Sequence, residues 1–581
     1  MPDHSSEDLA NIEQDILAGG LLRLLARREF WFGSDAFTNA TGVAARLHNA
    51  GSRDVLAEFA GVRTTGVNDF TLGRAFWQLI SQLDISAAEF IAATKAAVEQ
   101  GGLNPDDFFL PEPELEAWFD RDPLRAAEMI ETARQSAEQD IYVLNIGLRR
   151  GAKRDAERYL AAAIDLSDSS NARSRFLATH ALAEMDLPPG DGAERAISHL
   201  ESRLDAGTPK DRSAVLNVLA QLLARDLQKY EGRLVGDLEH VRVSVDPDEW
   251  RDLVIDMLWR HHKLLNASLL THLLLALDAV ELKAGAGLGH LENTLYFLVT
   301  GEHWPIATDF LARLLTRQSE IDLRSFNNLK YGLHASPGFS TTCCRWLITG
   351  NHSLCMAVRY LLNDRQNAEE TVVLADEETR NLIDLDRLRL ARRAIGYLFA
   401  TPLAATSFVV AALRGASDQA ALRISSDLLN PLLYCFSKKV RPYLETVVEA
   451  DPAIASWVSK AMTEQKAFHQ ALGGFEPLPE LEPSGIQRII AADVRHDEQV
   501  QMMEGIRAEM PLMSIIPTVK ILFGDATVSY FPKAPGSDEM ARSVMPMHTI
   551  GYEGEAARLA VWDQVGLNLE LHLQRTQPPA P

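Results

Sequence analysis

The stretch Glu7–Arg28, EDLANIEQDILAGGLLRLLARR, decides the fold class of this chain. Its apolar side chains recur at intervals of three to five residues, at Leu9, Ile12, Ile16, Leu21 and Leu25. Such intervals place side chains on one face of a helix, whereas a half-buried strand requires alternation. The stretch therefore predicts one amphipathic helix.

Start signals for further helices recur along the chain. Ser86 is followed three positions later by Glu89, which is the pattern of a capping box. Asp122-Pro123 and Asp246-Pro247 each place an N-cap residue before a proline at the first helical position. Helical periodicity also covers three later ranges, Trp304–Arg317, Leu385–Phe399 and Asp451–Leu472.

These patterns predict a mainly α fold up to about Gly473. A helical region of about 470 residues is too long for one bundle, so we expect an irregular helical-repeat (HEAT-like) solenoid or joined helical bundles. Thr179–Leu182 is similar to Thr271–Leu274, which indicates a degenerate two-helix repeat. In this region Val241–Val245 (VRVSV) alternates like a short strand.

Two acidic, proline-rich segments indicate domain boundaries. Phe475–Gly485 (FEPLPELEPSG) has three prolines and three glutamates and predicts an exposed linker, and Leu103–Glu116 is a second candidate. We expect four parts: an N-terminal helical domain over 1–110, a helical-repeat region over 111–474, a linker over 475–485 and a small α+β domain over 486–581.

The α+β character of the last part depends on two strand patterns. Thr518–Phe531 contains two β-branched and aromatic runs around Gly524-Asp525, which is a hairpin signal. Leu567–Leu573 has leucine at every second position and therefore predicts a half-buried strand.

The composition limits the function classes. The formal net charge of −23 over 581 residues disfavours general binding to the phosphate backbone, so nucleic acid is an unlikely partner. The uncharged stretch Ala394–Leu413 is interrupted by Pro402, which favours two buried helices over a membrane span. Four cysteines in so long a chain favour a reducing compartment, so we expect a cytoplasmic protein with no membrane partner.

Recognisable catalytic motifs are absent from the sequence: no phosphate-binding loop, no GxGxxG, no HExxH and no GxSxG occurs. Arg175 and His180 nevertheless resemble the HEPN ribonuclease motif, because they have its R-x-x-x-x-H spacing. The resemblance implies an all-helical protein in which the arginine and the histidine meet at a dimer cleft and act on RNA.

A second candidate site consists of metal-ligating residue types. His334, Cys343, His352 and Cys355 are the densest group of thiols and imidazoles, together with the adjacent Cys344. Thiolate and imidazole ligands suit tetrahedral zinc. Buried thiols in packed helices are the competing interpretation, and we expect no cofactor.

Two kinds of residue are candidates for binding a protein partner. Basic runs occur at Arg149–Arg154 and at Arg387, Arg389, Arg392 and Arg393. Such runs are either charge-balanced, solvated helix faces or docking sites for an acidic partner. The aromatic pairs Phe108-Phe109 and Trp118-Phe119 are the second candidates, as exposed anchors, and the competing interpretation places them in the core.

These observations favour a non-enzymatic scaffold for protein–protein interactions, or a subunit of a bacterial multi-protein system. The alternative is a component of a phage-defence system with a ribonuclease-like site at Arg175 and His180 or a zinc site at the Cys/His group.

Overall fold

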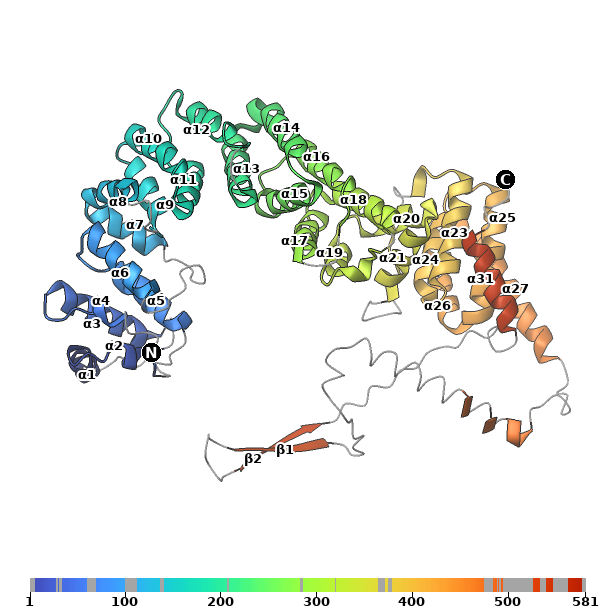
Figure 1. Cartoon of the computed structure of the whole chain (residues 1–581). Helices are drawn as coiled ribbons and strands as arrows, with labels where there is room; N and C mark the ends of the chain where they lie inside the picture. The colour runs from blue at the N-terminus through green and yellow to red at the C-terminus, as the bar shows by residue number, and fades with distance from the viewer. Residues whose placement is uncertain are drawn as a thin grey trace. The chain divides into compact units, whose positions relative to one another are not determined.

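The computed structural model confirms a mainly α fold, with the helices and strands labelled in Figure 1. The residues that it describes are 6–27, 30, 34–59, 69–99, 112–135, 141–205, 208–282, 286–318, 320–363, 371–374, 379–474, 484–487, 489–490, 493–494, 526–532, 540–546 and 563–576.

The chain divides into two units, residues 1–339 and 340–581, and each is considered by itself. The division lies at the start of α20 (Phe339–Thr349), whereas the sequence predicts its first boundary between residues 110 and 111. The expected linker over 475–485 lies outside the described residues except for its last two positions, so it stays a prediction.

Helices of the first unit pack in two series. The unit contains α1 (Ser6–Leu17), α2 (Leu21–Leu25), α3 (Asp35–Asn49), α4 (Leu56–Phe59), α5 (Asp69–Ile80), α6 (Ala87–Glu99), α7 (Glu112–Arg121), α8 (Pro123–Gln135), α9 (Leu144–Ala152), α10 (Ala156–Ser167), α11 (Ala172–Glu184), α12 (Gly192–Glu201), α13 (Pro209–Leu223), α14 (Leu227–Ser244), α15 (Pro247–His261), α16 (Ala267–Asp278), α17 (Ala286–Thr300), α18 (Trp304–Arg317) and α19 (Leu329–Ala335). From α7 to α19 each odd-numbered helix packs against the next odd-numbered one, and from α4 to α12 each even-numbered helix packs against the next even-numbered one.

The predicted helix starts are confirmed where a side chain caps the helix. Ser86 Oγ accepts a hydrogen bond from the Glu89 amide at 3.2 Å, and the Ser86 amide donates to Glu89 Oε2 at 2.8 Å, which completes the capping box. Asp246 caps α15 in the same way, since its Oδ1 accepts from the amides of Asp248 and Glu249 at 3.0 and 2.9 Å.

Two predictions in the first unit are wrong. The single helix predicted over Glu7–Arg28 is broken into α1 and α2, because Gly19 adopts a left-handed backbone with φ of 77°. Val241–Val245 is not a strand, because its first four residues form the last turn of α14. Val241 is buried and Val243 is 85% exposed, so the alternation of this segment reflects the two sides of a helix.

The second unit contains a helical core, a hairpin and a C-terminal helix. Its elements after α20 are α21 (His352–Asn363), α23 (Asp384–Leu398), α24 (Pro402–Leu413), α25 (Asp418–Asp427), η6 (Leu428–Leu433), α26 (Tyr434–Ala450), α27 (Pro452–Gly473), β1 (Ala526–Pro532), β2 (Met540–Pro546) and α31 (Gln564–Thr576). The uncharged stretch Ala394–Leu413 is split at Pro402 as predicted, and α24 is apolar on all sides and buried. None of the described helices is both long enough and apolar enough to cross a bilayer.

The C-terminal strand predictions are only partly confirmed. β1 covers the second run of the predicted hairpin, but it pairs antiparallel with β2, which follows it in the chain. The first run lies outside the described residues. Leu567–Leu573 is not a strand: it lies within α31, which packs against α23.

Candidate functional site

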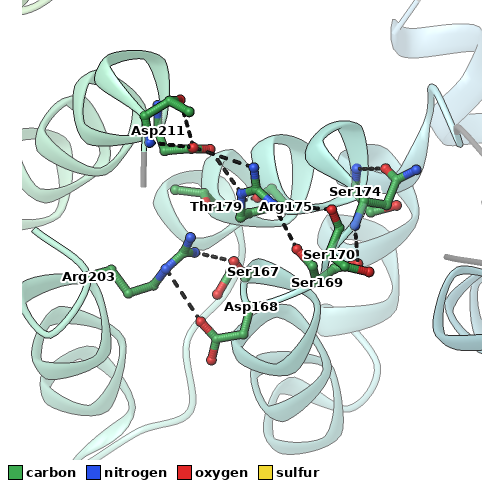
Figure 2. Close-up of polar contacts among 11 residues, drawn as sticks. Ser167, Asp168, Ser169, Ser170, Ser174, Arg175, Thr179, Arg203 and Asp211 are labelled. Carbon is green, nitrogen blue, oxygen red and sulfur yellow. Dashed lines mark hydrogen bonds and ion pairs between the residues drawn. The ribbon is translucent and has the colours of Figure 1, made fainter. Parts of the chain in front are cut away.

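Arg175 and His180 both lie on α11, but they serve different surroundings. They are five positions apart, and a helix turns by about 100° per residue, so their side chains diverge by about 140°. Arg175 Nε donates to Asp211 Oδ1 at 2.9 Å, and Arg175 Nη1 donates to the backbone oxygen of Ser169 at 2.9 Å (Figure 2). The guanidinium therefore links α11 to the start of α13.

Asp211 is the acceptor that fixes Arg175. Burial by itself would raise the pKa of its carboxyl, but hydrogen bonds from Arg175 and Thr208 outweigh burial and lower the pKa to about 2. The same carboxylate completes a capping box with Thr208 at the start of α13. Arg175 is thus bound to a permanently charged carboxylate, which competes with any substrate anion.

His180 lies in a separate polar cluster formed by α11, α13 and α15. Its ring centroid is 4.4 Å from that of Phe176, and burial, aided by the charge of Arg260, lowers its pKa to about 4. His261 is 7% exposed, its Nε2 lies 3.0 Å from Asn217 Oδ1, and burial also lowers its pKa to about 4. Both imidazoles are neutral at pH 7. The structure therefore does not bring Arg175 and His180 together as a ribonuclease-like pair within one chain.

A shift from pH 7 to pH 5.5 is expected to destabilise this cluster by about 1 kcal/mol through His261. In the unfolded chain His261 titrates near its ordinary pKa of about 6.5, so the unfolded state takes up the proton first and folding loses stability as pH falls towards 4. Thermal melting at both pH values should show a smaller drop for His261→Gln than for the parent. Equal drops would contradict a neutral, buried His261.

One Ser–His contact was missed by the sequence reasoning. Ser167 Oγ lies 2.7 Å from His199 Nε2, and Asp168 Oδ1 approaches the same nitrogen at 3.9 Å. A catalytic triad needs the carboxylate on the other ring nitrogen. Ser167 is fully buried and its hydroxyl also donates to the backbone oxygen of Ile164 at 2.7 Å, so this contact joins helices and is not a nucleophile site.

The zinc candidates are not assembled into a cluster. His334 lies on α19, Cys343 on α20, and His352 and Cys355 on α21. Burial raises the pKa of the Cys355 thiol to about 12, which disfavours the thiolate that zinc requires. His352 Nδ1 lies 3.1 Å from the hydroxyl of Tyr397. Within the described parts of the chain, no three or more His, Cys, Asp or Glu side chains are grouped to hold a metal ion.

Arg387 of the basic run on α23 is buried and its other three arginines are half-buried and paired, which disfavours this run as a docking site. Arg387 is only 2% exposed, and its guanidinium donates to backbone oxygens of residues 379–382 and of the end of α24, namely Thr379, Arg380, Leu382, Ala412 and Arg414. The other three arginines are also paired: Arg389 with Asp386 at 3.0 Å, Arg392 with Asp427 at 3.1 Å and Arg393 with the Leu347 backbone oxygen at 3.1 Å.

Several ion pairs between helices of the first unit join residues about 30 to 40 positions apart. Arg149 and Arg150 of the other basic run pair with Glu112, Glu116, Asp120 and Glu184 of α7 and α11. Hydrogen-bonded pairs of the same kind join residues 31 to 39 positions apart, among them Arg134–Asp165, Arg175–Asp211, Arg212–Glu249, Arg233–Glu194 and Arg313–Asp278. The interval by itself is not a sequence signal, because with 80 acidic residues among 581 almost any arginine has a carboxylate at such a distance.

The aromatic anchors are core residues where they are described. Trp118 and Phe119 are both fully buried, so their interpretation as exposed anchors is wrong and the competing one holds. Phe108-Phe109 lies outside the described residues.

An exposed aromatic surface occurs elsewhere, where α17 meets the turn that follows α15. Phe297 is 45% exposed, and His262 stacks on it with ring centroids 5.2 Å apart. The ammonium of Lys263 lies 5.7 Å from the same ring, and the neighbouring Leu264 is 47% exposed. We call these four residues the Phe297 surface. Three of its residues are consecutive and the fourth, Phe297, is 33 positions after Leu264, so the sequence alone does not indicate that they meet.

Comparisons with known proteins do not indicate a function for this chain. No protein-family model matches the chain, and no curated protein matches it. Among solved structures, the crystal structure of an engineered protein is similar at 13% identity over 79% of this chain and 99% of that chain, with a TM-score of 0.20. A score that low carries no argument about fold or function.

Proposed function

We propose that this chain is a non-enzymatic scaffold for protein–protein interactions, built as an irregular helical-repeat (HEAT-like) array. The packing of alternate helices in the first unit supports a repeat. So does the recurrence of arginine–carboxylate pairs at separations of 31 to 39 residues, since each pair then joins equivalent positions in successive helix pairs.

The Phe297 surface is the observation that carries this proposal. Partner-binding surfaces are enriched in aromatic side chains, and an exposed ring beside a lysine ammonium can serve as an anchor of this kind. Lys263 and His262 both border the ring. The arginines of the two basic runs, by contrast, are occupied by carboxylates and backbone oxygens of the chain itself.

The chemistry of this surface indicates an acidic segment that carries an apolar anchor. The whole chain has a net charge of −23, so a strongly acidic partner would be repelled from most of it. The Lys263 ammonium beside Phe297 would favour such a partner locally, and the exposed ring and Leu264 would accept its apolar side chain.

Phe297→Ala is expected to weaken partner binding about 30-fold, because an anchor ring at an interface contributes about 2 kcal/mol or more. The measurement is the affinity for the protein that co-purifies with the tagged chain from its native cells. Leu275→Ala is the matched control, since Leu275 on α16 is 49% exposed and lies outside the Phe297 surface. Equal retention of the partner by both variants, with unchanged melting, would reject this surface.

The alternative is a phage-defence component with a ribonuclease-like or zinc site, and it has less support. Arg175 is bound to Asp211, His180 is neutral at pH 7, and the Cys355 thiol resists ionisation. Membership of a bacterial multi-protein system and a cytoplasmic location remain part of the proposal on grounds of composition.

A further inference from the structure

The C-terminal helix α31 lies against α23 in the second unit through one of its faces. Leu567 and Leu571 are 6% and 8% exposed, and Gln574 is 5% exposed. Positions 567, 571 and 574 follow the i, i+4, i+7 spacing of a single helical stripe. Arg575 ends this face, because its Nε donates to the backbone oxygen of Gly396 at 2.6 Å.

The surface of α23 is shaped to receive this helix. A Cβ atom at Gly396 would lie 2.8 Å from Arg575 Cγ and 3.1 Å from the Arg575 amide nitrogen, so the helices approach this closely because position 396 is glycine. The Arg575 guanidinium lies 5.5 Å from the ring centroid of Tyr397, the next residue of α23. The Gly396 backbone oxygen, the Tyr397 ring and the space left by the absence of a side chain at Gly396 thus together recognise Arg575.

Polar groups complete the contact beside the two leucines. The outward side chains of α31 stay in water, since Val565 and Leu569 are 80% and 58% exposed. Gln574 Nε2 lies 3.4 Å from Asp427 Oδ1, and burial raises the pKa of that carboxyl. Gln574 Oε1 is buried and has no hydrogen-bond partner among the described residues. Two leucines and an incompletely satisfied amide are typical of a contact that can open.

The position of α31 in the sequence also indicates that its contact with α23 can open. Gly474, which follows α27, and Gln564 are 90 positions apart in the sequence. α31 therefore reaches its site as an element distant in sequence, and a partner segment present at sufficient concentration can compete with it.

We propose that the face of α23 around Gly396, with Asp427 of α25, is a binding site for an amphipathic helix, and that α31 is its ligand within the chain. The partner is a helix with two leucines four residues apart, glutamine three residues after the second and arginine next. This site lies in the second unit and is independent of the Phe297 surface, so either proposal can fail alone.

The test uses the full chain with α31 detached by Leu567→Asp and Leu571→Asp together. A fluorescent peptide of residues 563–576 should bind this double variant at least 30-fold more tightly than the parent, in which α31 fills the site. Leu569→Asp changes an exposed leucine of the same helix and should bind the peptide as weakly as the parent. Adding Gly396→Ala to the double variant should lower its peptide affinity at least 10-fold, because the methyl group occupies the place of Arg575.

A second measurement separates a detachable helix from a structural one. Gly396→Ala alone should increase hydrogen exchange in residues 564–576 and leave α24 protected. Increased exchange throughout α23 and α24, or unfolding of the double variant, would show that α31 is part of the core and overturn the proposal. A folded double variant that does not bind the peptide would overturn it too. If light scattering showed that the parent is a dimer and the double variant a monomer, α31 would bind a second copy of the chain, and the proposal of a separate partner helix would be overturned.

Discussion

Arg387→Ala is expected to lower the local stability of the second unit by about 3 to 5 kcal/mol, as expected when a buried hydrogen-bonded charge is lost. The guanidinium is 2% exposed and donates to the backbone oxygens of Thr379 at 2.7 Å and Leu382 at 3.0 Å. It also reaches Ala412 and Arg414, whose carbonyls end α24 and lack partners within that helix. Alanine would remove every one of these donors, and of the acceptors Thr379 would keep its bond from the Leu382 amide at 3.1 Å. Hydrogen exchange of the α24 amides measures the loss.

Arg389→Ala is the matched control on the same helix. Arg389 forms a pair with Asp386 three residues away at 3.0 Å, and a partly exposed pair of this kind contributes about 0.5 kcal/mol. A native-like Arg387→Ala variant that loses a protein partner would restore the docking interpretation of this basic run.

Local rules recovered the helix starts from the sequence. Ser86 with Glu89 and Asp246-Pro247 both mark observed starts, because a cap is satisfied by residues within one turn of itself. The break at Gly19 is also local, but a Gly-Gly pair within an apolar stripe does not reveal whether the chain will take a left-handed conformation there.

Packing against α23 decides whether Leu567–Leu573 forms a strand or a helix. Leucine at every second position from 567 to 573 predicts a strand, but Leu567 and Leu571 are also four residues apart and fit a helical stripe. Docking on α23 selects that stripe and leaves Leu569 58% exposed. The two patterns share residues, so the choice between them required the partner surface.

The candidate site was harder to predict than the fold, because charge in a sequence does not show what neutralises it. Arg387 reads like a member of a solvated basic run, yet its acceptors are backbone oxygens, which carry no sequence signature. Arg175 and His180 match a motif in spacing alone, and the carboxylate that binds Arg175 is 36 positions away. The Phe297 surface joins α17 to the turn after α15 and becomes visible only once these segments are packed.

Trp118→Ala is expected to lower the stability of α6 to α8 by about 3 to 5 kcal/mol, the usual cost of removing a fully buried tryptophan side chain. The Trp118 ring packs beside Phe90 and Phe119, with centroid distances of 4.7 and 5.0 Å. Its Nε1 donates to the Leu83 backbone oxygen at 3.0 Å. Arg125 covers the ring at 4.4 Å, and its Nη1 also donates to the backbone oxygen of Trp118 at 2.7 Å.

Two variants make this test decisive, with denaturant unfolding and partner binding measured on each. Trp118→Phe keeps most of the packed volume and loses the Nε1 hydrogen bond, so it should cost about 1 kcal/mol. Leu124→Ala changes a residue of α8 that is 63% exposed and should alter stability by less than about 0.5 kcal/mol. If Trp118→Ala instead unfolded like the parent and lost a partner, Trp118 would be a binding anchor. Its complete burial and its bond to Leu83 give the opposite expectation, because a ring held by the chain's own backbone has no surface left for a partner.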